Sequence, residues 1–166
     1  KNDYGLPDSS VVMSCFNQSF KIDKIIFDCW IDILHQVENS YLWLLEDNEV
    51  SKDNILTYAK SKNISTSRII FAPRINRNDH LIRLQLSDIT LDTRIYNGHT
   101  TTTDSIQCGV PIVTLIGNHF ASRVSASILK SIGLDELITQ NISSYKSLVI
   151  KLASDTDYLI EIKARL

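Results

Sequence analysis

The chain has little of what marks specialised architectures. Its 166 residues include only three cysteines, three prolines and five glycines, and its formal net charge is −2. The cysteines (Cys15, Cys29 and Cys108) are odd in number, far apart and without a C-x-x-C pair. That pattern favours reduced thiols in a cytoplasmic protein over a disulfide framework or a zinc site. A chain without excess positive charge is not built to coat nucleic acid or an anionic membrane.

Long apolar runs and common active-site motifs are missing as well. The longest apolar stretch, Val110–Ile116, is far shorter than the roughly 20 residues that cross a bilayer, and no signal segment opens the chain. No G-x-G-x-x-G, P-loop, G-x-S-x-G or H-E-x-x-H pattern occurs, which disfavours dinucleotide oxidoreductases, P-loop kinases, serine hydrolases and zinc proteases. The first residue is Lys1 rather than Met, so we expect a piece of a longer protein.

Short apolar segments alternate with longer helical patterns along the chain. Because the short segments are apolar nearly throughout, they predict strands covered on both faces: Ser10–Phe16, Ser40–Leu45, Arg68–Ala72, Asp88–Asp92 and Pro111–Leu115. The predicted helices are Lys24–Val37, Asp53–Asn63, Asn78–Leu84, Thr103–Cys108, Ser122–Ile132, a segment around Tyr145–Leu152, and Thr156–Leu166. This alternation implies right-handed crossovers, so we predict one α/β domain over residues 1–166 with a Rossmann-like, doubly wound parallel sheet.

Ligands of such sheets bind beyond the carboxyl ends of the strands, so the loops that follow the strands are the candidate sites. The strongest signal is Asn97–Asp104, which contains Gly98, His99 and four consecutive threonines. Threonine hydroxyls and free backbone N–H groups suit the start of a helix, where a phosphate is favoured. A capped turn that binds nothing accounts for the same residues.

Two other loops carry weaker signals. Lys21, with Gln18 nearby, follows the first predicted strand and could neutralise a diphosphate, or it could be a solvated surface lysine. His80 and Arg83 share one helix face after the third strand, where they could stack on a flat base or form a polar surface stripe. His119 follows the fifth strand and faces the same edge of the sheet.

Taken together, these loops resemble the carboxyl-terminal half of the catalytic region of the O-linked N-acetylglucosamine transferase and SPINDLY-like family. Several motifs in the same order are far more specific than any one of them, and here they run nearly from end to end. The matching segments are Tyr4–Pro7, Phe16–Gln18, Lys21–Asp23, Leu42–Leu45, Arg68–Phe71, Leu91–Thr93, Asn97–Thr101, Asp104, Gly109–Pro111 and Ala121–Val124.

The resemblance implies the second half of a type-B glycosyltransferase fold, which holds most of the sugar nucleotide, UDP-N-acetylglucosamine. It implies that Lys21 is catalytic, contacting the diphosphate and stabilising the departing UDP with Gln18 beside it. The remaining implied contacts are the diphosphate for His99, Thr100 and Thr101, the ribose for Asp104 and Arg77, and the uracil for Ile75, His80 and Arg83.

The same resemblance implies metal-independent, inverting transfer to a Ser or Thr hydroxyl of a protein acceptor, with no cofactor because the UDP-sugar is a co-substrate. The family's amino-terminal catalytic half and tetratricopeptide repeats are absent from the sequence, so we expect the chain alone to be inactive. Arg77 replaces a family lysine, Thr102 a glycine and Tyr96 a cysteine. Three alternatives stay open: a GDP-fucose-dependent relative, a non-catalytic nucleotide-binding module, and a nucleotide-sugar epimerase.

Overall fold

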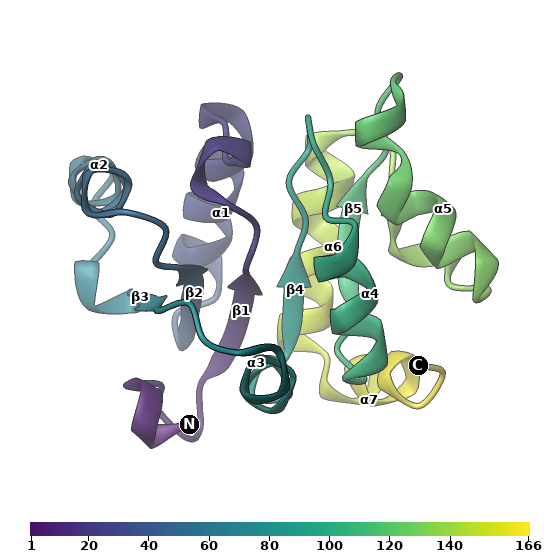
Figure 1. Ribbon diagram of the computed structural model, residues 1–166, viewed down its shortest axis with the longest axis horizontal. Coiled ribbons are helices and arrows are strands. Elements are labelled where there is room, and N and C mark those ends of the chain that lie inside the picture. Colours follow the sequence, from purple (N-terminus) through teal and green to yellow (C-terminus); the bar gives the residue numbers. More distant parts are fainter.

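The computed structural model describes residues 1–166 as a six-stranded sheet flanked by helices (Figure 1). The strands are β1 (Val11–Cys15), β2 (Ser40–Leu45), β3 (Ile69–Ala72), β4 (Ile89–Leu91), β5 (Ile112–Leu115) and β6 (Ile138–Thr139). They lie in the order β3-β2-β1-β4-β5-β6, and every pair is parallel. The predicted Rossmann-like, doubly wound parallel sheet is therefore confirmed.

Alternate residues of β1 show that both faces of the sheet are covered, because successive side chains of a strand point to opposite faces. Met13 and Cys15 belong to a large buried cluster that also contains residues of α1 (Lys24–Gln36) and α6 (Ile142–Ser154). Val12 belongs to a second cluster with Trp43 of β2 and Leu84 of α3 (Arg77–Leu84). This burial explains the nearly continuous apolar strands.

Side chains at the helix starts fix several helix boundaries. Asp23 caps α1 by accepting from the N–H of Ile25, Asn76 caps α3, Asn141 caps α6, and Asp155 caps α7 (Thr156–Lys163). Each cap satisfies a backbone donor that the helix itself leaves free. Capping thus sets where these helices meet the loops at the edge of the sheet.

Of the helices predicted with defined bounds, three start two or more residues away from the predicted position. Helix α2 (Glu49–Ser61) begins four residues before the predicted Asp53, because Asn48 caps it. Helix α4 (Thr100–Gln107) begins at the first of the four threonines rather than at the last, since β-branched residues cost little in a first turn whose N–H groups have no partner within the helix. Helix α5 (Val124–Ser131) begins after a short 3₁₀ turn, Phe120–Ser122, that overlaps the predicted helix start.

The sixth strand is absent from the prediction. Strand β6 is only two residues long and pairs with Thr114 and Leu115 of β5, so it has no periodicity that could identify it. At the end of α5, Gly133 has a left-handed φ of 72° and stops the helix as predicted. None of the helices is both long and apolar enough to span a membrane.

Candidate functional site

The loop between β4 and α4 closes around the buried carboxylate of Asp92. One oxygen of Asp92 accepts from the N–H groups of Thr93 (2.9 Å) and Gly98 (2.7 Å), and the other accepts from the Thr114 hydroxyl (2.7 Å). Burial raises the pKa of Asp92, and these hydrogen bonds oppose that rise. The loop is therefore held from inside the protein.

Helix α4 begins immediately after this loop. The N–H groups of Thr100, Thr101 and Thr102 have no acceptor within the chain, and no side chain caps the helix. The N–H of Thr103 donates to the carbonyl of His99 at 3.2 Å. Free N–H donors at a helix start, together with the helix dipole, form a receptive position for an anion.

Lys21 and His99 both contact the ring of Tyr96. The Lys21 ammonium is 4.0 Å from the centroid of the Tyr96 ring and donates to the Asn97 carbonyl at 3.2 Å. The ring of His99 lies 5.3 Å from that of Tyr96, and its Nε2 atom is buried without a hydrogen-bond partner. Burial lowers the pKa of Lys21, while the Asp92 carboxylate opposes this. We call Lys21, Tyr96 and His99 the loop group.

Seven of the ten predicted site residues line one cavity of about 460 Å³. It lies between the loop that follows β3 and the start of α4, and we call these residues the cavity group: Ile75, Arg77, His80, Arg83, Thr100, Thr101 and Asp104. Asp104 is nearly buried and pairs with Arg77 at 2.6 Å. The sequence thus identified residues that the fold brings together from α3 and α4.

Arg83 does not present its donors freely to this cavity. It is only 2% exposed, donates from Nη1 to the Pro73 carbonyl at 2.7 Å, and donates from Nε to His80 Nδ1 at 3.1 Å. Because Nδ1 accepts that bond and burial lowers the pKa of His80, the neutral His80 ring carries its proton on Nε2. Arg83 therefore supports His80 and the loop after β3, and the predicted shared helix face is confirmed as a direct contact.

Gln18 joins neither group. Its side chain is exposed and makes no hydrogen bond within the chain, although its carbonyl accepts from the N–H of Lys21 at 3.0 Å. Of the ten predicted residues, Lys21, His99 and Gln18 therefore lie outside the lining of the cavity.

Asn17 is a site residue whose role sequence reasoning missed. It is buried, donates from Nδ2 to the Thr93 hydroxyl at 2.9 Å, and accepts from the Thr101 hydroxyl at 2.8 Å. It thereby joins the loop after β1 to both ends of the loop before α4. The available signal was a polar residue within two positions of the end of an apolar strand, as Asn17 is after β1 and Asp92 is after β4.

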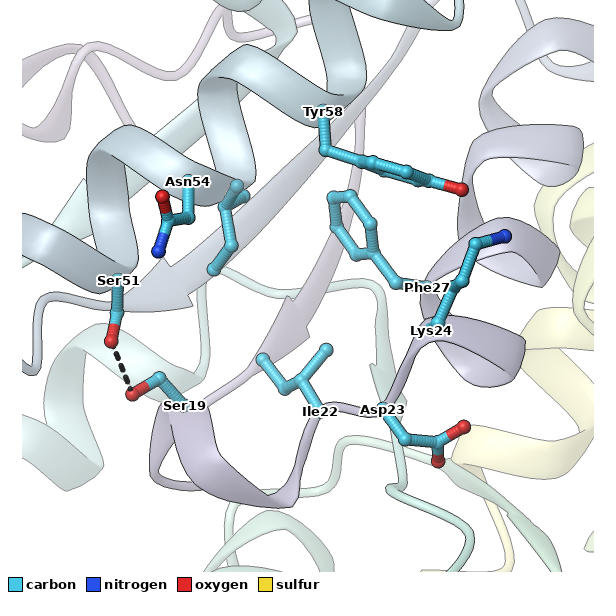
Figure 2. A pocket seen from close by; sticks show the side chains of 9 residues that line it. Ser19, Ile22, Asp23, Lys24, Phe27, Ser51, Asn54 and Tyr58 are labelled. Atoms are coloured by element: carbon cyan, nitrogen blue, oxygen red, sulfur yellow. Dashed lines mark hydrogen bonds between the residues drawn. The ribbon is translucent and has the colours of Figure 1, made fainter.

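A second cavity, of about 430 Å³, lies between the start of α1 and α2 (Figure 2). Apolar side chains of Ile22, Phe27 and Tyr58 line it, and at one end Ser19 Oγ donates to Ser51 Oγ at 3.0 Å. None of the ten predicted residues lines this cavity, so it is separate from the candidate site. No three His, Cys, Asp or Glu side chains are grouped so that they could hold a metal ion.

An open parallel sheet whose carboxyl edge combines an uncapped helix start, a lysine and a polar cavity has the arrangement of α/β proteins that bind nucleotides. Comparison with known proteins agrees with this class. The model of glycosyl transferase family 41 matches residues 1–166, and the chain belongs to that family.

Two relatives, both N-acetylglucosaminyltransferases by name, match nearly the whole chain. The chain is 38% identical over 162 residues to a UDP-N-acetylglucosamine–peptide N-acetylglucosaminyltransferase of Caenorhabditis elegans, a match that covers 98% of this chain and 14% of the relative. It is 37% identical over 154 residues to the probable transferase SEC of Arabidopsis thaliana, covering 92% of this chain and 16% of that one.

The fold is also similar to that of a solved transferase structure. A mutant of the O-GlcNAc transferase of Thermobaculum terrenum superposes with a TM-score of 0.90 at 27% identity, over 94% of this chain and 31% of that chain. The chain thus spans less than a third of the length of each of these relatives.

Proposed function

We propose that this chain is the donor-binding half of a protein O-glycosyltransferase that takes UDP-N-acetylglucosamine and transfers the sugar to Ser or Thr hydroxyls. The observation that carries the proposal is the uncapped start of α4, whose Thr100 and Thr101 line the cavity and directly follow His99 of the loop group. Membership of family 41 and the names of the relatives, which specify the donor and a peptide acceptor, support the choice of substrates.

The nucleoside would occupy the cavity. Asp104 is held by Arg77 and can accept from ribose hydroxyls, since a carboxylate only accepts hydrogen bonds. His80, with its proton on Nε2, can donate to a base carbonyl, while Ile75 offers an apolar contact at the rim. Thr100 and Thr101 line both the cavity and the helix start, so a nucleoside there would lead directly to a diphosphate on α4.

The chemistry would use the loop group and the free N–H groups of α4. When the bond between the anomeric carbon and the β-phosphate oxygen breaks, its electron pair passes to UDP. The acceptor oxygen forms the new bond to that carbon and gives up its proton to a base. Lys21 and the N–H groups of Thr100 and Thr101 would stabilise the charge on UDP, and losing one such donor typically costs ~10²–10³ in rate.

The proposal assigns this chain the role of one half of the site. Its matches cover only 14% and 16% of the two curated relatives. We therefore propose that an amino-terminal catalytic half, which these 166 residues do not contain, completes the site and that a protein is the acceptor. We propose that the chain binds donor and transfers no sugar by itself. A cytoplasmic location is part of the same proposal, supported by three free thiols.

Calorimetric titration of the chain with UDP tests the proposal. We expect saturable binding that weakens as ionic strength rises, because a diphosphate is being neutralised, and that weakens in the Lys21→Ala variant. Lys24→Ala is the matched control, since Lys24 is exposed and paired with Asp28 on the outside of α1. Its affinity should equal that of the parent.

Competing functions predict other results. Tighter binding of GDP than of UDP would favour the GDP-fucose-dependent relative. The absence of UDP binding at millimolar concentration, with Lys21→Ala indistinguishable from the parent, would favour a non-catalytic module. Release of a free, altered sugar by the full-length protein would indicate an epimerase.

A further inference from the structure

The Lys21 ammonium is held in a defined position without any ligand. It lies 4.0 Å from the centroid of the Tyr96 ring and 3.2 Å from the Asn97 carbonyl oxygen. An ammonium has three N–H donors, so one is used by the carbonyl and two remain. The ring contributes attraction through its electron-rich face without using a donor.

The segment that carries Tyr96 is itself fixed. The Thr93 hydroxyl donates to the Tyr96 carbonyl at 2.6 Å, and Asn97 Nδ2 donates to the Thr93 carbonyl at 2.6 Å. The N–H of Asn97 donates to the Ala121 carbonyl at 2.8 Å. Thr93 and Asn97 are fully buried, so the Tyr96 ring projects from a rigid turn toward the lysine on the neighbouring loop.

We propose that Tyr96 is a positioning residue for Lys21: its ring holds the ammonium beside the start of α4, with two donors free for a diphosphate. A lysine side chain has four rotatable bonds, and ordering it costs conformational entropy when a ligand binds. Holding the ammonium in place beforehand removes part of that cost, which improves the affinity for the ligand. This inference rests on the proposed function, because it concerns the same diphosphate.

Two substitutions at Tyr96 distinguish the effect of its electron-rich ring face from the effect of its side-chain volume. Tyr96→Leu removes the electron-rich face, whereas Tyr96→Phe keeps it. We expect Tyr96→Leu to raise the dissociation constant for UDP about three- to tenfold, the size that a partly exposed cation–π contact supports. Tyr96→Phe should stay within about twofold of the parent. Tyr96 is 41% exposed, so both variants should fold, and thermal unfolding checks this.

Two further comparisons distinguish positioning from structural support. Uridine has no diphosphate, so its affinity, titrated by NMR, should not change in Tyr96→Leu. In a Lys21→Met background, Tyr96→Leu should have no further effect on UDP binding, because the group that the ring holds is gone. In the ligand-free protein, the Lys21 methylene protons should be shifted upfield by the ring in the parent and in Tyr96→Phe, but not in Tyr96→Leu.

Three outcomes overturn the inference alone: unchanged UDP affinity in Tyr96→Leu, equal loss for UDP and uridine, or an undiminished effect in the Lys21→Met background. If the parent does not bind UDP at all, the proposed function fails, and the inference fails with it. The two failures are therefore distinguishable.

Discussion

Replacing Asp92 with alanine should destabilise the fold by about 2–6 kcal/mol. The carboxylate is fully buried and accepts from the N–H groups of Thr93 and Gly98. Without it, both donors remain in the interior with no partner. Each buried donor left unpaired costs about 1–3 kcal/mol, which gives the stated range for two. Globular domains are stable by only about 5–15 kcal/mol, so the variant should be marginally folded.

Replacing Asp92 with asparagine should lower the unfolding free energy much less. Its amide oxygen can still accept from the two N–H groups, and its NH₂ group would face the Thr114 hydroxyl, which can accept as well as donate. We expect Asp92→Asn to lose about 1 kcal/mol, the net value of an ordinary hydrogen bond. The difference in unfolding free energy between the two variants therefore measures the cost of leaving the N–H donors unpaired rather than the effect of removing a charge.

Urea unfolding followed by far-ultraviolet circular dichroism gives the free energies by linear extrapolation. Asp53→Ala on the exposed side of α2 is the control, and it should lie within about 0.5 kcal/mol of the parent. The reasoning is refuted if Asp92→Ala lies within about 1 kcal/mol of the parent, or if asparagine and alanine at this position are equally destabilising.

Three further predictions concern the same edge of the sheet. Because burial raises the pKa of Asp92, protonation of its carboxyl favours the folded state. This pKa-linked part of the stability is complete below the ordinary value of 3.8 and is lost as pH rises through the folded value, whereas the hydrogen bonds to the two N–H groups remain. The unfolding free energy of the parent, relative to Asp92→Asn, should therefore fall over this window in urea titrations. In Gly98→Ala, the new Cβ would clash with the hydroxyls of Thr101 and Thr102 at the start of α4, so UDP titration should show weaker binding; equal affinity would contradict a close approach there. Burial raises the pKa of Cys15 to about 12, so this thiol should resist iodoacetamide at pH 8 in the folded protein and react after unfolding, as peptide mass analysis can show.

Much of the sheet was predictable from the sequence because its strands are apolar on both faces. Segments such as Ser40–Leu45 are short, apolar and bounded by polar residues, and that pattern is typical of strands in a covered parallel sheet. Strand β6 had no such signal, since only two residues pair. The predicted start of α4 was wrong because it relied on the low helix propensity of threonine. That propensity describes residues in the interior of a helix, whereas the threonines here occupy the first turn, before the helix makes its first internal hydrogen bond.

The candidate site was predictable only where its residues lie close together in the chain. The spacing of His80 and Arg83 predicted a shared helix face, and the two side chains do touch. The spacing could not show that Arg83 turns inward to the Pro73 carbonyl, since that depends on how the loop after β3 folds back. The contact of Lys21 with Tyr96 joins residues 75 positions apart, so no local pattern encodes it.

The backbone N–H donors of the β4–α4 loop and of the start of α4 form two sets. Together they explain how a buried carboxylate can lie close to a position that favours an anion. The N–H groups of Thr93 and Gly98 point inward and bind Asp92, whereas those of Thr100 and Thr101 have no partner in the protein. The charge on Asp92 would repel a diphosphate if it acted alone. It also favours the protonated form of Lys21, whose pKa burial lowers. Asp92 therefore fixes the loop from below and helps to keep the lysine charged, so that the outward donors and the ammonium together can attract the ligand.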